Sequence, residues 1–107
     1  MNLRNRVQLI GNMGKNPIVK ELENGRKMVR FSLATNEYYT QNGERKQDTT
    51  WHNVVAWNKT AEIIEKHMES GAEVVLNGKL RSRSYDDAKG ERKYITEVVV
   101  DEVLFRK

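Results

Sequence analysis

A change of hydrophobic period constrains the fold of this chain more than any other feature of its sequence. Residues 49–57, TTWHNVVAW, alternate with the period of two that is typical of a β-strand. Residues 58–71 then place Ala61, Ile64 and Met68 at helical spacing, with charged side chains on the opposite side. The period therefore predicts a strand that leads directly into one helix.

Four further stretches alternate as strands do. They are residues 4–11, 27–36, 73–85 and 92–105. For the helix, Asn58 or Thr60 can cap the start and Gly71 the end. Five strands with one helix between the third and the fourth are the element order of a five-stranded OB-fold, a Greek-key barrel. We therefore predict an all-β chain of small α content that forms one domain over residues 1–107.

Turn sequences separate the predicted strands. Residues 11–17, GNMGKNP, are predicted to form a turn that contains Gly11 and Gly14. The polar segment 38–50, with Asn42-Gly43 as its turn signal, reads as a mobile hairpin loop. Residues 86–91, DDAKGE, favour a turn that joins the last two strands into a long antiparallel hairpin.

The composition of the chain limits the classes of partner and of reaction that are possible. Nineteen Lys and Arg against fifteen Asp and Glu give a net charge of +4, which favours nucleic acid, anionic lipid or acidic protein, although a solvated basic surface without a partner is equally compatible. There is no cysteine, so disulfides and thiol chemistry are excluded. The chain shows no membrane-length apolar run and its N-terminus lacks the pattern of a secretory signal, so we expect a cytoplasmic protein.

Two exposed faces can be predicted from alternation. Trp51, Asn53, Val55 and Trp57 share one face of their strand, and the amide of Asn53 would need a partner if that face were buried, so the tryptophans lean outward. In the next strand one face carries a basic stripe with an aromatic end, formed by Lys79, Arg81, Arg83 and Tyr85. Its spacing is comparable to that of phosphates along an extended single strand. Lys and Arg on an exposed strand also discourage aggregation, which is the alternative interpretation.

The remaining aromatic and titratable residues give weaker signals. Tyr38, Tyr39 and Tyr85 are candidates for exposed rings, in contact with a ligand or simply at the rim. His67 reads as structural, and His52 faces away from the tryptophans, where it packs or bridges subunits. No metal-ligand spacing, phosphate-binding loop or catalytic arrangement is present in the sequence, so we predict no catalytic residues, no metal and no cofactor.

Five motifs together resemble a known family, the bacterial single-stranded DNA-binding proteins. They are NRVQLIGNMGKNP, VRFSLATNE, TTWHNVVAWNKTAE, GAEVVLNGKLRSRSY and YITEVVV, in the order and at the spacing of that family's DNA-binding domain. The resemblance implies an OB-fold, a homotetramer, and sequence-tolerant binding and protection of single-stranded DNA in replication, recombination and repair. It also implies a nucleoid-associated location in the cytoplasm.

The resemblance also assigns roles by position. The base-stacking aromatics of the family fall at Tyr39, Trp51, Trp57 and Tyr85. Its basic residues along the DNA fall at Arg6, Lys20, Lys59, Arg81 and Arg83, to which the stripe adds Lys79. His52 matches a histidine that the family places at a subunit interface.

The sequence departs from the family pattern in three places. Tyr39 and Tyr85 stand where tryptophan is common, so stacking there should be weaker, and Asn53 stands where a cation is common. The family usually continues into a flexible linker and an acidic tip that recruits other proteins, whereas this sequence stops at DEVLFRK. A naturally tail-less member and a truncated chain both fit, and tip-dependent recruitment is not expected of the sequence as it stands.

Two other classes of function use the same residues. An RNA-binding OB domain would present the same rings and cations, and competition between RNA and DNA oligonucleotides would separate the two. A structural or assembly protein would use its exposed rings in a protein interface, where aromatic residues and Arg are also enriched.

Overall fold

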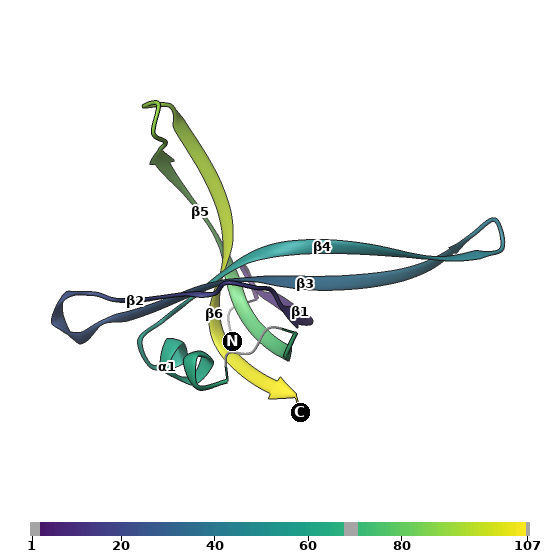
Figure 1. Cartoon of the computed structure of the whole chain (residues 1–107), viewed down its shortest axis with the longest axis horizontal. Helices are drawn as coiled ribbons and strands as arrows, with labels where there is room; N and C mark the ends of the chain where they lie inside the picture. The colour runs from purple at the N-terminus through teal and green to yellow at the C-terminus, as the bar shows by residue number, and fades with distance from the viewer. Residues whose placement is uncertain (1–2, 68–70, 107) are drawn as a thin grey trace.

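The computed structural model describes residues 3–67 and 71–106 (Figure 1). Five of its strands close into a barrel through their pairings. These strands are β1 (Val7–Met13), β3 (Lys27–Gln41), β4 (Glu44–Trp57), β5 (Glu73–Asp86) and β6 (Arg92–Arg106). The helix α1 (Asn58–Lys66) lies between β4 and β5 in the chain, which are the third and fourth strands of the barrel. The predicted five-stranded OB-fold is therefore confirmed.

The barrel closes through pairings between strands that are far apart in sequence. Hydrogen bonds connect the strands in the order β1-β5-β6-β4-β3, and β3 pairs with β1 again where Asn12 lies opposite Ala34. All of these pairings are antiparallel except β4 with β6, which is parallel with Val54 opposite Val98. One parallel contact among antiparallel hairpins is what the Greek-key order of this barrel requires.

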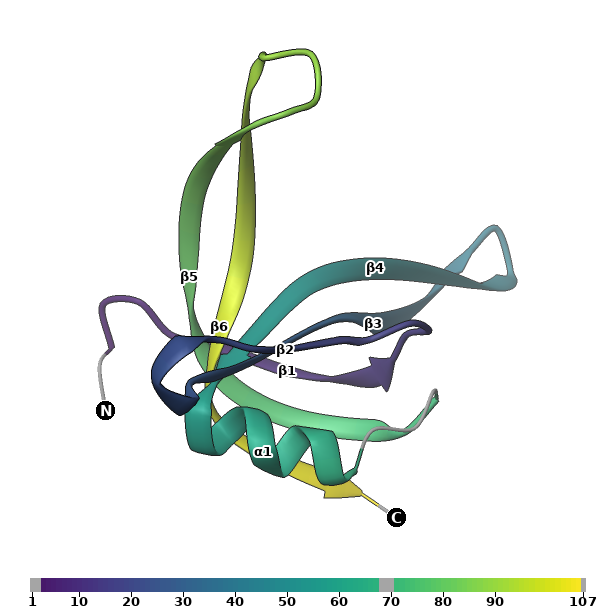
Figure 2. The ribbon, with the colours of Figure 1, turned by 60° about the vertical axis from the view of Figure 1, so that its left-hand side comes forward.

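The core follows the predicted alternation. Val54 and Ala56 are fully buried, as is Ile64, which reaches the same core from α1. The other buried apolar side chains that form this core are Met13, Val29, Phe31, Leu33, Ala61, Val74, Leu76, Val98 and Val100. Met68, which we expected on the same helical stripe, lies outside the described residues. In Figures 1 and 2, α1 lies at the end of the barrel opposite the β5–β6 hairpin.

The predicted turn at residues 11–17 is wrong in its first half. β1 continues to Met13, and Gly11 lies buried inside the strand. A Cβ atom on Gly11 would clash with the carbonyl oxygen of Ala34 in β3. Glycine is needed there because two backbones approach closely, which is the usual alternative meaning of glycine in a strand.

The predicted mobile loop at residues 38–50 is also wrong, because the strands run through it. β3 and β4 pair in unbroken register from Met28 opposite Trp57 to Gln41 opposite Glu44. Only Asn42 and Gly43 form the turn, with φ angles of 52° and 78°. Positive φ at both central residues gives the turn whose twist matches that of the flanking strands, so polar strands continue to the tip.

Smaller differences concern the short segments. Residues 18–21 form an additional strand, β2 (Ile18–Glu21), which pairs with β3 and precedes a single 3-10 turn (Glu23–Gly25). The N-cap position of α1 is Trp57, and no described side chain bonds to the first turn, so neither Asn58 nor Thr60 caps the helix. At the other end the N–H of His67 bonds to the carbonyl of Ile64, and Gly71 lies beyond the helix.

Two long hairpins extend beyond the barrel in different directions (Figures 1 and 2). We call residues 36–49 the β3–β4 arm and residues 81–96 the β5–β6 arm. The predicted turn of the β5–β6 arm is confirmed, and the Asp87 carboxylate accepts the N–H groups of Lys89 and Glu91 there. Among the described residues no helix has the length and apolar character needed to cross a membrane.

Candidate nucleic-acid interface

The tryptophan strand and the basic stripe belong to one face of the sheet. Val55, which shares the face of the tryptophans, pairs with Val99 in β6, and Val99 pairs with Lys79 in β5. Residues directly opposite one another in a sheet project to the same side. We call this side the outer face. The structure thus brings together two sets of residues that the sequence could assign only to separate strands.

Trp51 is exposed over a backbone platform. Its side chain is 61% exposed, and a Cβ atom added to Gly14 would lie 2.9 Å from Cζ3 of its ring. The indole therefore lies against the backbone of Gly14, with its other side accessible. Lack of a side chain at Gly14 is what allows the ring to lie this close to the barrel.

Trp57 and its neighbours form a more enclosed part of the outer face. Trp57 is half-buried, and the guanidinium carbon of Arg26 lies 5.2 Å from its ring centroid, a cation–π contact. Asn53 is exposed, whereas Val55, between the two tryptophans, is fully buried. The sequence pattern predicted an outward strand face but not that its centre would be covered by neighbouring side chains.

A buried carboxylate lies beneath the basic stripe. Glu97 of β6 is 1% exposed, and its Oε1 accepts hydrogen bonds from Arg81 Nη2 at 2.7 Å and from Arg83 Nε at 3.0 Å. Arg30 of β3 approaches the other oxygen, with Nη2 3.9 Å from Oε2, and its buried Nε has no hydrogen-bond partner in the described part of the chain. Arg81 and Arg83 keep partly exposed side chains, so one carboxylate holds two arginines at the surface.

The protonation of Glu97 follows from these contacts. Burial alone would raise the pKa of Glu97, but the hydrogen bonds from Arg81 and Arg83, together with their charges, outweigh it and hold the pKa below its usual value. Glu97 is therefore ionised at neutral pH, and the group of three arginines and one carboxylate keeps a net positive charge. An anionic ligand would meet cations whose positions are already set.

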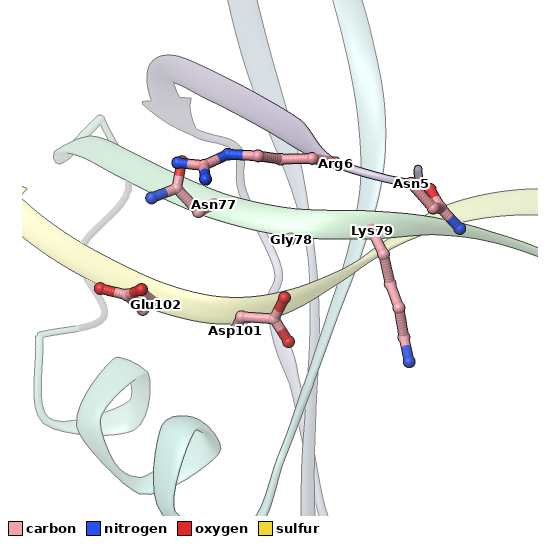
Figure 3. Close-up of a pocket in the computed structure, with 7 residues that line it drawn as sticks. All are labelled: Asn5, Arg6, Asn77, Gly78, Lys79, Asp101 and Glu102. Atoms are coloured by element: carbon pink, nitrogen blue, oxygen red, sulfur yellow. The ribbon is translucent and has the colours of Figure 1, made fainter. Parts of the chain in front are cut away.

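Lys79 and Arg6 line one cavity at the base of the stripe, shown in Figure 3. The cavity has a volume of about 330 Å³ and is also lined by Asn77, Asp101 and Glu102. The two carboxylates lie on the far side of the cavity from the Arg6 guanidinium in Figure 3. Arg6 thus shares a cavity with Lys79 of the stripe, in a locally mixed charge environment, and its contact with DNA stays a prediction.

The other predicted residues are spread along the arms and around Trp57. Lys20 in β2 pairs with Met28, which pairs with Trp57, so Lys20 shares the outer face. Lys59 is exposed in the first turn of α1, close to Trp57 in the chain. Tyr85 is exposed on the β5–β6 arm with Arg83 6.0 Å from its ring centroid.

Tyr39 is exposed on the β3–β4 arm but not on the outer face. It pairs with Lys46. In the alternation of β3 and β4, Tyr39 lies on the same side as Leu33 and His52. That side faces the inside of the barrel. Whether Tyr39 stacks on a ligand therefore stays a prediction.

His52 lies away from the outer face, as predicted. Its Nε2 is 2.9 Å from the hydroxyl of Thr35, and its side chain is partly buried. It lines a surface cavity of about 420 Å³ together with Leu9 and Ile10 of β1. His67, predicted to be structural, stacks on Phe105 with ring centroids 4.9 Å apart.

Glu97, Gly14 and Arg26 are among the contributors to the outer face that sequence reasoning missed. Glu97 has a signal in retrospect, because it is an isolated acidic residue in the apolar strand YITEVVV. Gly14 and Arg26 have none, because their roles depend on the side chains of Trp51 and Trp57, which reach them across the fold.

Comparisons with known proteins agree with one another. A family model described as "Single-strand binding protein family" matches residues 4–106. The single-stranded DNA-binding protein of Bacteroides thetaiotaomicron is 45% identical over 100 residues, which cover 91% of this chain and 62% of that protein. Single-stranded DNA-binding protein 1 of Chlorobaculum tepidum is 41% identical over 97 residues, which cover 89% of this chain and 60% of the relative. The chain thus spans about three fifths of the length of these relatives.

A solved structure is similar over the whole chain. It is the Plasmodium falciparum SSB in complex with ssDNA, with a TM-score of 0.85, 33% sequence identity and 100% coverage of both chains.

Proposed function

Because this chain belongs to the single-strand binding protein family, we propose that it binds and protects single-stranded DNA with little sequence preference, in replication, recombination and repair. The observation that carries the proposal is the outer face, where the exposed ring of Trp51 lies on the same side of the sheet as the stripe of Arg81 and Arg83. Aromatic rings beside cations are the combination that binds single strands.

Two physical terms supply the affinity. Each ring that stacks on a base contributes roughly 1 to 3 kcal/mol, and it accepts any base because every base has a π face. Each neutralised phosphate makes the affinity fall with salt, at a slope of about −0.7 on a logarithmic scale. Neither term requires a nucleophile, a base or a metal, so we propose a binding protein and not an enzyme.

The proposed roles follow the family positions. Stacking residues are Tyr39, Trp51, Trp57 and Tyr85, and phosphate contacts are Arg6, Lys20, Lys59, Lys79, Arg81 and Arg83. The hydrogen bonds from Arg81 and Arg83 to Glu97 support a fixed spacing of these two cations. The whole described barrel with its two arms acts as the binding unit.

We also propose that the protein assembles into a homotetramer in the cytoplasm, associated with the nucleoid. An apolar row on the outside of β1, β5 and β6 supports self-association. Ile10 pairs with Val75, which pairs with Leu104, and Ile10 and Leu104 are 57% and 65% exposed. Exposed apolar rows of this kind mark protein interfaces. His52, which lines a cavity beside Ile10, is the proposed interface histidine.

The experiment is a titration with oligo(dT), followed by tryptophan fluorescence and run at two salt concentrations. We expect quenching at low salt and weaker binding at high salt. Trp51→Ala should weaken binding by about 5- to 150-fold, which corresponds to the loss of one stacked base. Tyr94→Ala is the matched control, because Tyr94 is 74% exposed on the β5–β6 arm but pairs with Ser84 on the side away from Arg83.

Three results would count against this function. Absence of quenching at low salt would reject DNA binding, and unchanged affinity in Trp51→Ala would reject the role of the outer face. Preference for RNA over a matched DNA oligonucleotide in competition would reassign the ligand.

A further inference from the structure

Three asparagines of this chain are followed directly by glycine. They are Asn24, Asn42 and Asn77. The side-chain amide of an asparagine is close in the chain to the backbone nitrogen of the next residue. A glycine at that next position leaves its nitrogen unhindered and its backbone free to rotate. An Asn-Gly pair can therefore react with itself wherever the fold leaves it exposed and able to move, and the structure places the three pairs in three different environments.

The pair Asn42-Gly43 is the least restrained of the three. It forms the two-residue turn between β3 and β4, at the end of the β3–β4 arm farthest from the barrel (Figure 1). Both residues are exposed, and no atom lies within 4 Å of a Cβ atom built on Gly43. Within residues 3–67 and 71–106 no hydrogen bond holds the side-chain amide of Asn42 or the N–H of Gly43. The two reacting groups are thus open to water and to each other.

The pair Asn77-Gly78 is the most restrained. It lies inside β5, where both residues pair with β1 on one side and with β6 on the other. Gly78 is buried, and a Cβ atom built on it would clash with the carbonyl oxygen of Val99. The backbone at Asn77 cannot rotate toward its side chain unless the strand first separates from its neighbours. This pair should therefore be protected by the fold.

The pair Asn24-Gly25 lies between these extremes. Both residues are exposed, and Asn24 has a positive φ of 67°, as Asn42 has one of 52°. The pair belongs to a 3-10 turn, however, and the N–H of Leu22 donates to the carbonyl of Arg26 across that turn. The turn must loosen before the nitrogen of Gly25 can reach the side chain of Asn24, so we expect an intermediate rate.

We propose that Asn42 is a site of spontaneous deamidation, by which the tip of the β3–β4 arm gains a carboxylate as the protein ages. A base removes the proton from the backbone nitrogen of Gly43, and this nitrogen attacks Cγ of Asn42. The new C–N bond closes a cyclic succinimide, while the side-chain nitrogen leaves as ammonia. Water then opens the ring at either carbonyl and gives aspartate or isoaspartate. Water is consumed and ammonia released, and nothing is oxidised or reduced.

The two products change the arm in different ways. Aspartate keeps the backbone as it is and adds a negative charge two residues before Glu44. Isoaspartate directs the backbone through the former side chain and so inserts a methylene group. A two-residue turn with positive φ at both positions has no room for an extra backbone atom, so the pairing of Gln41 with Glu44 should be lost. The modification does not depend on DNA binding.

The test incubates the full chain at mildly alkaline pH, in native buffer and in denaturant, and follows the three pairs by mass spectrometry of peptides. In the folded chain Asn42 should convert first and Asn24 several-fold more slowly. Asn77 should convert at least about 100-fold more slowly than Asn42, because its reaction requires opening of the sheet. In denaturant the three rates should agree within about threefold, since all three asparagines precede glycine and the fold no longer separates them.

Two variants provide matched controls. Asn42→Gln keeps the amide but lengthens the side chain by a methylene group, which disfavours ring closure. It should abolish conversion at the tip and leave the rates at Asn24 and Asn77 unchanged. Asn42→Asp carries the new charge on an intact backbone. Amide hydrogen exchange in the β3–β4 arm should be faster in aged wild type than in Asn42→Asp, and equal exchange would reject the loosening of the tip.

Three results would overturn the proposal. Equal rates at Asn42 and Asn77 in the folded chain would show that the fold does not select the site. Conversion of Asn24 before Asn42 would move the site from the arm to the 3-10 turn. A rate at Asn77 that stays slow in denaturant would show that neighbouring residues, and not the sheet, protect it. The oligo(dT) titration tests the proposed function separately.

Discussion

The two arms of this barrel carry the same pair of side chains and hold them in different ways. In the β5–β6 arm Arg83 lies 6.0 Å from the ring centroid of Tyr85, and in the β3–β4 arm Arg45 lies 5.0 Å from that of Tyr38. Arg83 also donates to the buried carboxylate of Glu97. Arg45 has the tyrosine ring but no carboxylate among the described residues.

The difference shows two ways of presenting a cation to a polyanion. Beside Glu97 the arginines lose little freedom on binding, because their geometry is already set, but the carboxylate neutralises one of their charges. Arg45 keeps its whole charge and must be ordered when a ligand binds. We therefore expect the β5–β6 arm to hold its cations at fixed positions. The β3–β4 arm should give a larger salt dependence of binding affinity per cation.

The largest effect should come from forcing β1 away from β3 where the barrel closes, at the base of the β3–β4 arm. Gly11→Ala places a Cβ atom against the backbone carbonyl of Ala34, where the barrel closes, and should lower the free energy of unfolding by about 3 kcal/mol. Gly43→Ala at the tip is the control. No atom lies within 4 Å of its added Cβ, so only the positive φ is penalised, by about 1 kcal/mol. Chemical unfolding measures both, and equal losses would contradict the importance of the closure.

A second change removes the buried carboxylate of Glu97, which distinguishes the β5–β6 arm from the β3–β4 arm. Glu97→Ala leaves the guanidinium groups of Arg81 and Arg83 without their shared acceptor and should lower the free energy of unfolding by about 2 kcal/mol, since the arginines can still reach water. Glu44→Ala in the β3–β4 arm removes only an exposed ion pair with Lys46 and should cost less than about 0.5 kcal/mol. Denaturant midpoints compare the stability of the two variants. Similar values would mean that the buried carboxylate stabilises the fold no more than an exposed ion pair does.

The smallest effect, and the most specific one, is a dependence on pH. The pKa of Glu97 is lower in the folded chain than in the unfolded one. Its contribution to stability is therefore complete above the unfolded pKa and is lost as the pH falls through the folded pKa. The difference in unfolding free energy between wild type and Glu97→Gln should be largest near neutral pH and should shrink in acid. A difference that stays constant down to acidic pH would show that Glu97 does not titrate with folding.

Much of the fold could be predicted because alternation is a local property. The alternation of residues 49–57 predicts which side of that strand is exposed, and Val54 and Ala56 lie buried on the other side. The turn at Asn42-Gly43 is predicted from two residues. The errors have physical causes of longer range. Gly11 read as part of a turn because the close approach of Ala34 is invisible from nearby sequence, and residues 38–50 read as a loop because polar strands lack a hydrophobic signal.

The sequence by itself determined the strand and helix order, the exposed side of the tryptophan strand, the basic stripe and the family. Each of these depends on residue types at fixed spacing. Only the tertiary structure decided that the tryptophans and the stripe share one face and that Glu97 lies beneath Arg81 and Arg83. These relations depend on the register between strands, which is set by barrel closure and by contacts between distant segments.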